Sequence, residues 1–303
     1  MYSRSQLKKA VAEPRRLWWE LNRLYYRRLG TRPHNTDGID LFAADWDNLL
    51  ILDACRYDTF AEHSTLPGTL TSRTSRGSAT SEWIRANFHG QTLHDTVYVS
   101  ASPMLYRNRD TVDVEFHAVV DIWKEAGWDE TYRTVLPETV TEAARQAAAR
   151  YPDKRLLVHY LQPHYPFLGP TGREHFAGDR LNFQWMDLTT GTLTTDPELV
   201  RTAYRENLDV VLPHVEELLS DLRGKTVVTS DHGQMLGERG FPIPVPGYGH
   251  PPGVYNESLT RVPWHEYTNG KRKRIVADEP TFERDTVDDS VVTERLEQLG
   301  YVG

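Results

Sequence analysis

The sequence predicts an α/β fold in which a mostly parallel central sheet is covered by helices on both faces. Four short runs of aliphatic and β-branched residues alternate with longer segments of helical periodicity. Alternation of this kind is typical of strand–helix–strand units with parallel pairing. The chain has 303 residues, 39% of them hydrophobic, which suits one large domain with a short appendage.

The four runs predict buried strands, since they are short and almost continuously apolar. The first, DNLLILDACRYD (47–58), reaches Asp53. The third runs into a loop that carries His164, and the fourth stops abruptly at Asp231 and His232, which glycines follow. The remaining predicted strands cover residues 95–103, 154–167 and 224–233.

Helical periodicity lies between these runs and after the last one. It predicts helices over residues 81–88, 115–126, 137–150 and 197–222. NGKRKR (269–274) predicts a turn. The final segment, TVDDSVVTERLEQLGYVG (286–303), predicts a closing helix with Asp288 or Asp289 as its N-cap.

A basic segment, residues 1–33, precedes the main domain, residues 34–303. Within it, EPRRLWWELNRLYYRRLG (13–30) has helical periodicity and ends at Gly30, a helix stop. Two interpretations stay open. The helix packs on the domain with its arginines in solvent, or residues 14–30 lie against an anionic membrane surface. The apolar residues of this segment are Leu17, Trp18, Leu21, Leu24, Tyr25 and Leu29.

The net charge of −8 is unevenly distributed. Residues 1–33 carry +7 and the rest of the chain −15, which argues against nucleic acid as the main partner. Only seven of the 35 basic residues are lysine. An acidic, lysine-poor composition suggests a protein that works in high salt, as in halophilic archaea, because carboxylates keep a surface hydrated.

The single cysteine, Cys55, excludes an internal disulfide framework and a multi-cysteine zinc site. No run approaches the eighteen or so apolar residues of a membrane span, and arginines interrupt the early apolar residues where a signal peptide would lie. We therefore expect a cytoplasmic protein, with peripheral contact at a membrane surface as the alternative.

Polar groups that can bind a metal follow the predicted strands. Asp53 follows the first, His159 and His164 belong to the third, and Asp231 and His232 end the fourth. Carboxyl ends of parallel strands meet at one edge of a sheet, where ligands bind. Two carboxylates and an imidazole suit Mn²⁺ or Zn²⁺ best, and Ca²⁺ or Mg²⁺ less well.

An alternative explains the same residues without a metal: Asp53 caps a helix and His232 is a hydrogen-bonded core histidine. The distance between the side chains separates the two interpretations. A separation of more than about 8 Å between the Asp53 carboxyl and the Asp231–His232 pair would exclude a shared ion.

Five motifs resemble those of the alkaline phosphatase/sulfatase superfamily, in order and at fitting intervals over residues 45–265. They are LLILDACRYD, GSATSEW, HYLQPHYPF, VVTSDHGQMLGERG and HPPGVYNESLTRVPW. The likeness is to the sulfatase-like and phosphoglycerol-transferase-like branches. It implies an alkaline-phosphatase-like three-layer sandwich, and Ser-Asp-His-Gly followed by Leu-Gly-Glu is its most specific part.

The resemblance implies roles for residues at matching positions. Asp53, Asp231 and His232 match metal ligands. Thr80, followed by Ser81 and Glu82, resembles a nucleophile that also touches the metal, and Ser78 is the second candidate. Contact with a metal lowers the pKa of a hydroxyl. The alternative is that these are ordinary turn residues.

Two histidines match positions that contact the charged group of the substrate: His164 in QPHYPF and His250 in GYGHPPG. Idle loop histidines are the alternative. Arg56 and Arg76 are further candidates for binding the anion. By contrast, Asp209 and His214 lie on a predicted amphipathic helix, which argues against a second metal pair there; one metal is expected, with a second possible through His250 or His164.

Cys55 departs from the sulfatase pattern. The Cys/Ser-x-Pro-x-Arg motif that is oxidised to formylglycine does not occur in the chain, so ordinary sulfatase chemistry is not expected. The sequence thus predicts a metal-dependent hydrolase of phosphate or sulfate esters that works through a hydroxyl nucleophile and a covalent intermediate. Alternatives are a phospho-alcohol transferase acting on a lipid or glycan, and a non-catalytic metal- or glycan-binding descendant.

Overall fold

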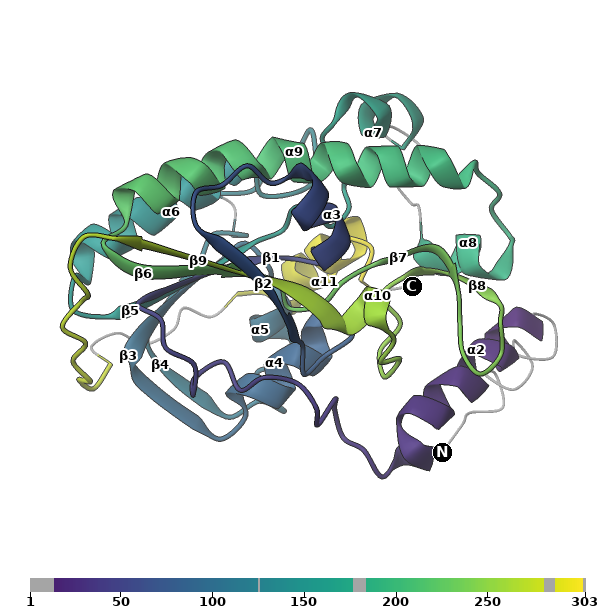
Figure 1. Ribbon diagram of the computed structural model, residues 1–303, viewed down its shortest axis with the longest axis horizontal. Coiled ribbons are helices and arrows are strands. Elements are labelled where there is room, and N and C mark those ends of the chain that lie inside the picture. Colours follow the sequence, from purple (N-terminus) through teal and green to yellow (C-terminus); the bar gives the residue numbers. More distant parts are fainter. Residues whose placement is uncertain (1–13, 125, 177–183, 281–286, 302–303) are drawn as a thin grey trace.

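A computed structural model describes residues 14–124, 126–176, 184–280 and 287–301. Its centre is a seven-stranded sheet with the order β2-β9-β6-β1-β5-β3-β4 (Figure 1). β9 runs antiparallel to both its neighbours, and the other adjacent pairs are parallel. The strands are β1 (Asn48–Leu52), β2 (Thr69–Thr74), β3 (Gln91–Ser100), β4 (Val114–Asp121), β5 (Arg155–Tyr160), β6 (Gly224–Thr229) and β9 (Arg261–Asn269).

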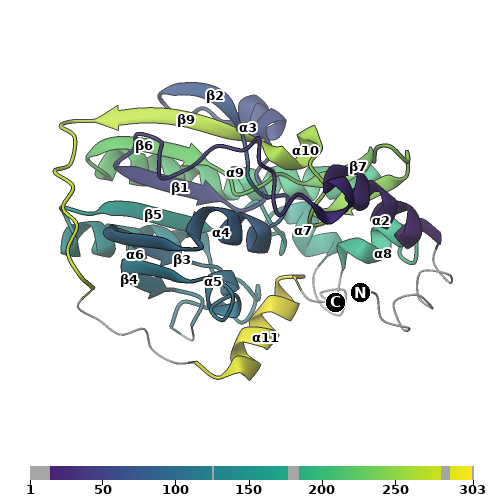
Figure 2. The same ribbon diagram turned by 90° about the horizontal axis from the view of Figure 1, so that it is seen from below.

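Helices cover both faces of this sheet, as expected for a three-layer α/β sandwich (Figure 2). One face carries α3 (Tyr57–His63), α6 (Pro137–Arg150) and α9 (Pro197–Asp221). The other carries α4 (Thr80–Phe88), α5 (Met104–Arg107) and α11 (Asp289–Gln298). The predicted fold class is therefore confirmed.

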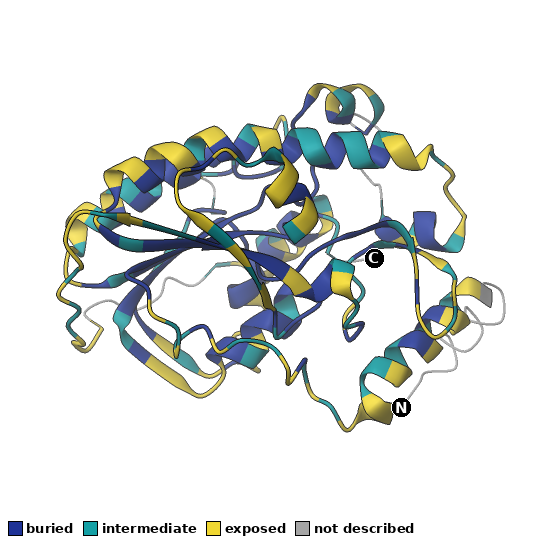
Figure 3. Ribbon diagram, viewed as in Figure 1, coloured by how far each residue is buried: buried dark blue, intermediate teal, exposed yellow. Residues whose placement is uncertain are grey.

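Burial explains why the inner strands read as continuous apolar runs. All five residues of β1 are buried, and so are the last five of β5, because helices lie on both sides of them (Figure 3). α9 buries one apolar stripe along its length, as expected for the amphipathic helix that the sequence predicts; the stripe includes Leu208, Val211, Leu212, Val215, Leu218 and Leu219.

One predicted helix is wrong. Residues 115–126 were expected to be helical, but β4 occupies Val114–Asp121 and pairs in parallel with β3 as the last strand of the sheet. An outermost strand is covered less evenly than an inner one, and its burial along β4 is mixed, so the apolar positions imitate helical spacing. The other predicted helices and strands are present, and Asp288 is the N-cap of α11, accepting a hydrogen bond from Ser290 N.

A group of smaller elements lies beyond the carboxyl ends of the strands, on the right in Figure 1. It comprises the antiparallel pair β7 (Met235–Arg239) and β8 (Pro246–Gly249), with α2 (Pro14–Tyr26), α7 (Pro170–His175), α8 (Trp185–Thr190) and α10 (Glu257–Thr260). A 3-10 turn, η1 (Arg28–Gly30), follows α2. No helix among the described residues is both long and apolar enough to cross a membrane.

α2 packs on the β7–β8 pair through a face that the sequence did not indicate. Trp19 and Asn22 are buried, and their side chains donate hydrogen bonds to Pro246 O (3.1 Å) and Ile243 O (2.9 Å). Gly247 permits this contact, since a Cβ there would lie 2.3 Å from the Trp19 ring. Residues 1–13 of the predicted basic segment lie outside the described residues.

Candidate metal centre and active site

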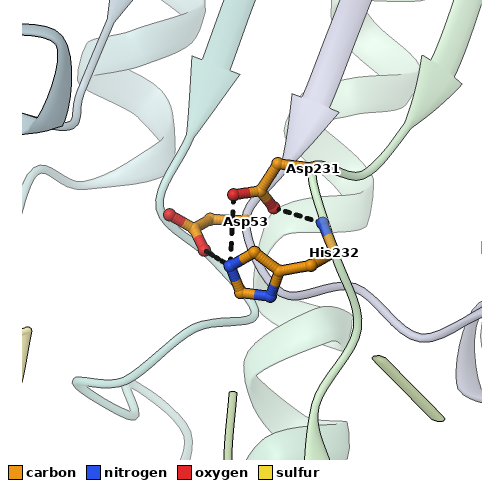
Figure 4. A group of neighbouring side chains, drawn as sticks. All are labelled: Asp53, Asp231 and His232. Carbon is orange, nitrogen blue, oxygen red and sulfur yellow. Dashed lines mark hydrogen bonds and ion pairs between the residues drawn. The ribbon is translucent and has the colours of Figure 1, made fainter. Parts of the chain in front are cut away.

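The strand register brings the two acidic motifs together. β1 and β6 are parallel neighbours with Ile51 opposite Thr229, so Asp53 and Asp231 follow adjacent strands at the same edge. The Ser230 hydroxyl locks the two strand ends: it donates to Leu52 O at 2.6 Å and accepts from Cys55 N at 2.8 Å. The side chains of Asp53, Asp231 and His232 therefore converge on one point (Figure 4).

These three side chains form a compact buried group. Each offers one ligand atom, and those atoms all lie within 4.8 Å of one another. All three residues are 0% exposed. This separation is well inside the limit of about 8 Å for a shared ion. The sequence therefore predicted correctly that Asp53 lies close to Asp231 and His232.

The ligand atoms of these three side chains are suited to bind a divalent cation. Asp53 Oδ1 and Asp231 Oδ2 are buried without a hydrogen-bond donor among the described residues, although buried oxygens of this kind are normally satisfied. His232 Nδ1 must donate to Gly233 O at 2.8 Å, because a carbonyl only accepts. Its Nε2 is therefore the nitrogen available to a metal, and it lies 3.2 Å from Asp231 Oδ2 and 3.7 Å from Asp53 Oδ1. Two carboxylates and an imidazole are a fitting donor set for a divalent metal.

A bound cation would relieve the electrostatic repulsion between the two carboxylates. Burial and the nearby Asp231 carboxylate raise the pKa of Asp53 well above its ordinary value. The pKa of Asp231 is also pushed up by burial, but His232, His159 and the hydrogen bond from Ala54 N hold it below the ordinary value. Two buried carboxylates at this distance repel each other when both are charged, and a bound cation removes that cost.

Thr80 is the hydroxyl that the structure brings to this group. It is the first residue of α4, fully buried, with Oγ1 3.2 Å from His232 Nε2. The positive end of the α4 dipole favours negative charge on an oxygen at this position. Ser78 is engaged elsewhere: its hydroxyl bonds to Glu82 Oε2 (3.0 Å) and Pro251 O (3.1 Å).

His164 and His250 form a pair beside the metal group. Their Nε2 atoms are 2.8 Å apart, and the His250 ring lies 4.5 Å from that of His232. Because His164 Nδ1 donates to Tyr165 O (2.6 Å), its Nε2 accepts and His250 Nε2 donates. Burial lowers the pKa of His164 to about 4, and burial together with His232 and His164 lowers that of His250 well below its ordinary value, so both are neutral near pH 7.

His159, although on the inner strand β5, also reaches the centre. Its Nδ1 is 2.8 Å from Tyr98 Oη and its Nε2 is 3.7 Å from Asp53 Oδ2. Cys55 is fully buried in the main core, as expected for a packing residue.

The arginine candidates bind carboxylates of the protein. Arg56 pairs with Asp58 and Glu238, and Arg76 pairs with Asp40. The two residues on α9 are also apart from the centre, since Asp209 pairs with His63 and His214 with Glu138.

Sequence reasoning missed Tyr301. Its hydroxyl donates to Asp53 Oδ2 and lies 3.4 Å from Thr80 Oγ1, and its ring stacks on His164 with centroids 4.7 Å apart. Residues 286–303 were predicted only to form a closing helix, because nothing in a Leu-Gly-Tyr sequence at the end of a helix signals a ligand site.

A pocket of about 320 Å³ gives access to the centre. Thr80, His250 and Tyr301 lie on its wall, whereas Asp53, Asp231 and His232 lie behind them. Its lining also includes apolar side chains, among them Trp19 from α2 and Trp185 from α8. Thr80 is therefore a hydroxyl-bearing residue that both lines the pocket and contacts His232.

No protein-family model and no curated protein matches the chain. Solved structures do resemble it. The C-terminal periplasmic domain of phosphoethanolamine transferase EptC from Campylobacter jejuni has 14% identity and a TM-score of 0.47 over 73% of this chain and 78% of that one. The corresponding EptC domain from Escherichia coli, solved with zinc, has 15% identity and a TM-score of 0.44 over 75% of each chain. A phosphonate monoester hydrolase from Silicibacter pomeroyi has 14% identity and a TM-score of 0.46 over 83% and 72%.

With identities of 14–15% and TM-scores below 0.5, these likenesses assign no activity to this chain. What it does follows from its own residues.

Proposed function

We propose that this protein is a metal-dependent hydrolase of phosphate or sulfate esters, with residues 34–303 as the catalytic domain and Thr80 as the nucleophile. One observation carries the proposal: two unsatisfied buried carboxylate oxygens and an imidazole nitrogen surround a point beside the hydroxyl of Thr80, a residue that lines a pocket. Such a cluster is costly for stability, and its groups have the chemistry of a catalytic metal site.

Asp53, Asp231 and His232 would hold the cation, with Mn²⁺ or Zn²⁺ favoured by the mixed oxygen and nitrogen donors. When bound, a divalent ion supplies Lewis acidity, which lowers the pKa of a neighbouring hydroxyl and neutralises charge on an ester oxygen. The side chains of the protein would carry out the nucleophilic attack and bind the transferred group. The Thr80 oxygen attacks the phosphorus or sulfur, the ester oxygen leaves, and water or an acceptor alcohol then releases the group from Thr80.

The histidine pair suits the binding of the transferred group. His250 lies on the pocket wall and His164 directly behind it, so a proton arriving with an oxyanion can be shared between their Nε2 atoms. Prepositioned donors stabilise the charge that develops on the equatorial oxygens. Most of the rate in such reactions comes from this positioning and electrostatic stabilisation.

The test is a substitution at each hydroxyl. With Mn²⁺ or Zn²⁺ and a panel of aryl phosphates, phosphodiesters and aryl sulfates, Thr80→Ala should lose at least about 10³-fold in kcat/KM. Ser78→Ala is the matched control, since that hydroxyl points to Pro251 and Glu82, and it should stay within several-fold of wild type. Wild type no faster than Thr80→Ala on every ester would support a non-catalytic binding protein instead.

Transfer to an alcohol is the second candidate, and the apolar lining of the pocket favours it, because Trp19 and Trp185 suit the non-polar part of a lipid-linked substrate. Phosphorus-31 spectra of the products, recorded with and without an acceptor alcohol, separate the two reactions. With a phosphodiester as the donor, a new phosphodiester signal in the presence of the acceptor indicates transfer, and a phosphomonoester signal alone indicates hydrolysis.

We also propose that the protein works in the cytoplasm against an anionic membrane surface, with α2 as the contact. The exposed large apolar side chains of the described residues gather on α2, η1, the segment at α8 and the β7–β8 connection: Leu17, Trp18, Leu21, Tyr25, Leu29, Met186, Leu193 and Phe241. The Tyr25 and Phe241 rings touch, with centroids 5.3 Å apart. The basic charge of residues 1–33 complements anionic lipid.

Flotation with vesicles tests this contact. Wild type should bind vesicles rich in phosphatidylserine more strongly than pure phosphatidylcholine, and Trp18→Glu should abolish most of that binding. Gln146→Glu adds the same charge at an exposed site on α6 and serves as the control. Equal binding of both variants, or a concentration-dependent dimer that Trp18→Glu disrupts, would contradict the membrane contact.

A further inference from the structure

The end of the chain reaches the metal centre in a way that its local sequence dictates. α11 ends at Gln298, and Gly300 adopts a left-handed conformation with φ of 77°. Gly300 N donates to Glu297 O (3.0 Å) and Tyr301 N to Leu296 O (2.9 Å). This is the Schellman arrangement, which reverses the chain direction at a helix end and favours glycine there. The turn directs Tyr301 into the site.

α11 is held in place by contacts that do not involve Tyr301. Val292, Leu296 and Leu299 are buried in the main core. At the helix surface, Arg295 pairs with Glu130 at 2.8 Å and lies over the Trp128 ring. The position of the last turn is therefore set independently, and the tyrosine side chain can be changed without releasing the helix.

The Tyr301 hydroxyl determines how Asp53 presents its carboxylate. It occupies Oδ2 with a hydrogen bond, while Oδ1 has no donor among the described residues and lies on the side of His232 Nε2, 3.7 Å away. The same ring stacks on His164 at an interplanar angle of 9°. One side chain thus fixes the orientation of a carboxylate in the cation-binding group and supports the histidine pair.

We propose that Tyr301 is a positioning residue of the metal centre, which holds Asp53 so that Oδ1 is free for the cation. The inference rests on the metal site proposed above and extends it to the C-terminal residues, which lie outside the five motifs. Groups that hydrogen-bond a metal ligand from behind orient it, and removing them typically lowers metal affinity about 10–100-fold.

The experiment compares Tyr301→Phe with Tyr255→Phe in the full chain. Tyr255 also donates its hydroxyl to a carboxylate, that of Glu82, which is not part of the cation-binding group. Isothermal titration with Mn²⁺ and with Zn²⁺ should show about 10–100-fold weaker binding for Tyr301→Phe and wild-type affinity for Tyr255→Phe. The visible spectrum of bound Co²⁺, which reports coordination geometry, should change only in Tyr301→Phe.

A third variant, Gly300→Ala, keeps every hydroxyl but strains the turn that delivers Tyr301, because its φ is unfavourable for alanine. It should weaken cation binding less than Tyr301→Phe and protects the test if that variant folds poorly. Wild-type affinity and an unchanged Co²⁺ spectrum in Tyr301→Phe would overturn the positioning role alone. A wild-type protein that binds none of the three ions would overturn the metal centre itself, and this inference with it.

Discussion

β1 carries a buried aspartate at each end, and the two are treated in opposite ways. Asp47, just before the strand, accepts hydrogen bonds from Arg272 Nη2 (3.2 Å) and Lys225 N (2.8 Å), and Arg272 Nε also bonds to it. Asp53, just after the strand, faces a second carboxylate and keeps one oxygen without a donor among the described residues.

The pKa values express the same contrast. Burial raises the pKa of Asp47, but hydrogen bonds from Arg272 and Lys225 N more than offset this and hold it below the ordinary value. For Asp53, burial and Asp231 act in the same direction and raise it well above. A buried acid that serves the fold is neutralised by the protein itself, whereas one left unsatisfied beside a second acid indicates a ligand that the protein does not supply.

The largest effect is expected from a substitution of Asp53, at the carboxyl end of β1. Asp53→Asn removes one carboxylate of the cation-binding group and should lower kcat/KM by at least about 10³-fold, with loss of metal binding. The same change relieves the repulsion between two buried acids, so the metal-free variant should unfold at the same temperature as wild type or higher. Calorimetry in EDTA checks this, and a clearly lower melting temperature would show that Asp53 serves the fold.

A pH series sharpens the contrast in the metal-free protein. Burial lowers the pKa of His159 and His164 to about 4, from an ordinary value of 6.5. Between these values the two imidazoles are protonated in the unfolded chain and neutral in the folded one, so their contribution makes stability fall as pH decreases from 6.5 toward 4. Each of the two imidazoles should cost about 1.4 kcal/mol per pH unit. Urea denaturation in EDTA measures the slope, which His159→Gln should reduce.

Metal addition should stabilise only those proteins that retain Asp53. Mn²⁺ or Zn²⁺ at a hundred times its Kd should increase the free energy of unfolding by about 2.7 kcal/mol in wild type. Asp53→Asn should show no such gain, and Asp47→Asn should show all of it. A gain of equal size in all three proteins would place the ion elsewhere in the chain.

The smallest effect on activity is expected from a substitution of Asp47, just before β1. Asp47→Asn weakens the hydrogen bonds with Arg272 and should cost about 2 kcal/mol of stability. Since the charge lies at the opposite end of β1 from the proposed site, activity below the melting temperature should equal that of wild type. A loss of activity without a loss of stability would refute this assignment.

The parts of the fold that the sequence predicted are those with a single strong periodic signal. The inner strands β1, β5 and β6 are continuous apolar runs, and α9 has a long apolar stripe. β9 was missed because Pro263 sits inside it and because most of the residues after Trp264 are charged or polar, which argues against a central strand. β4 was assigned wrongly because an outermost strand lacks the even burial of an inner one.

The candidate site divides in the same way. Asp53, Asp231 and His232 were predicted together because each follows an apolar strand, and parallel strands end at a common edge. Tyr301 could not be predicted, since its place depends on how α11 docks on the domain and not on any pattern around it. The sequence left open whether the apolar residues of α2 are packed or exposed. Leu17, Trp18 and Tyr25 are exposed, because the packing face of that helix is made by Trp19 and Asn22.

The lock formed by Ser230 between β1 and β6 has a consequence for how such a protein can diverge. Adjacent strands in a sheet are held about 4.8 Å apart by their backbone, so the spacing of Asp53 and Asp231 is built into the scaffold and needs no loop to maintain it. His250, Trp19 and Trp185 instead come from surrounding segments that line the pocket. Mutations in these segments can therefore change the substrate preference of the proposed enzyme while Asp53 and Asp231 keep their spacing.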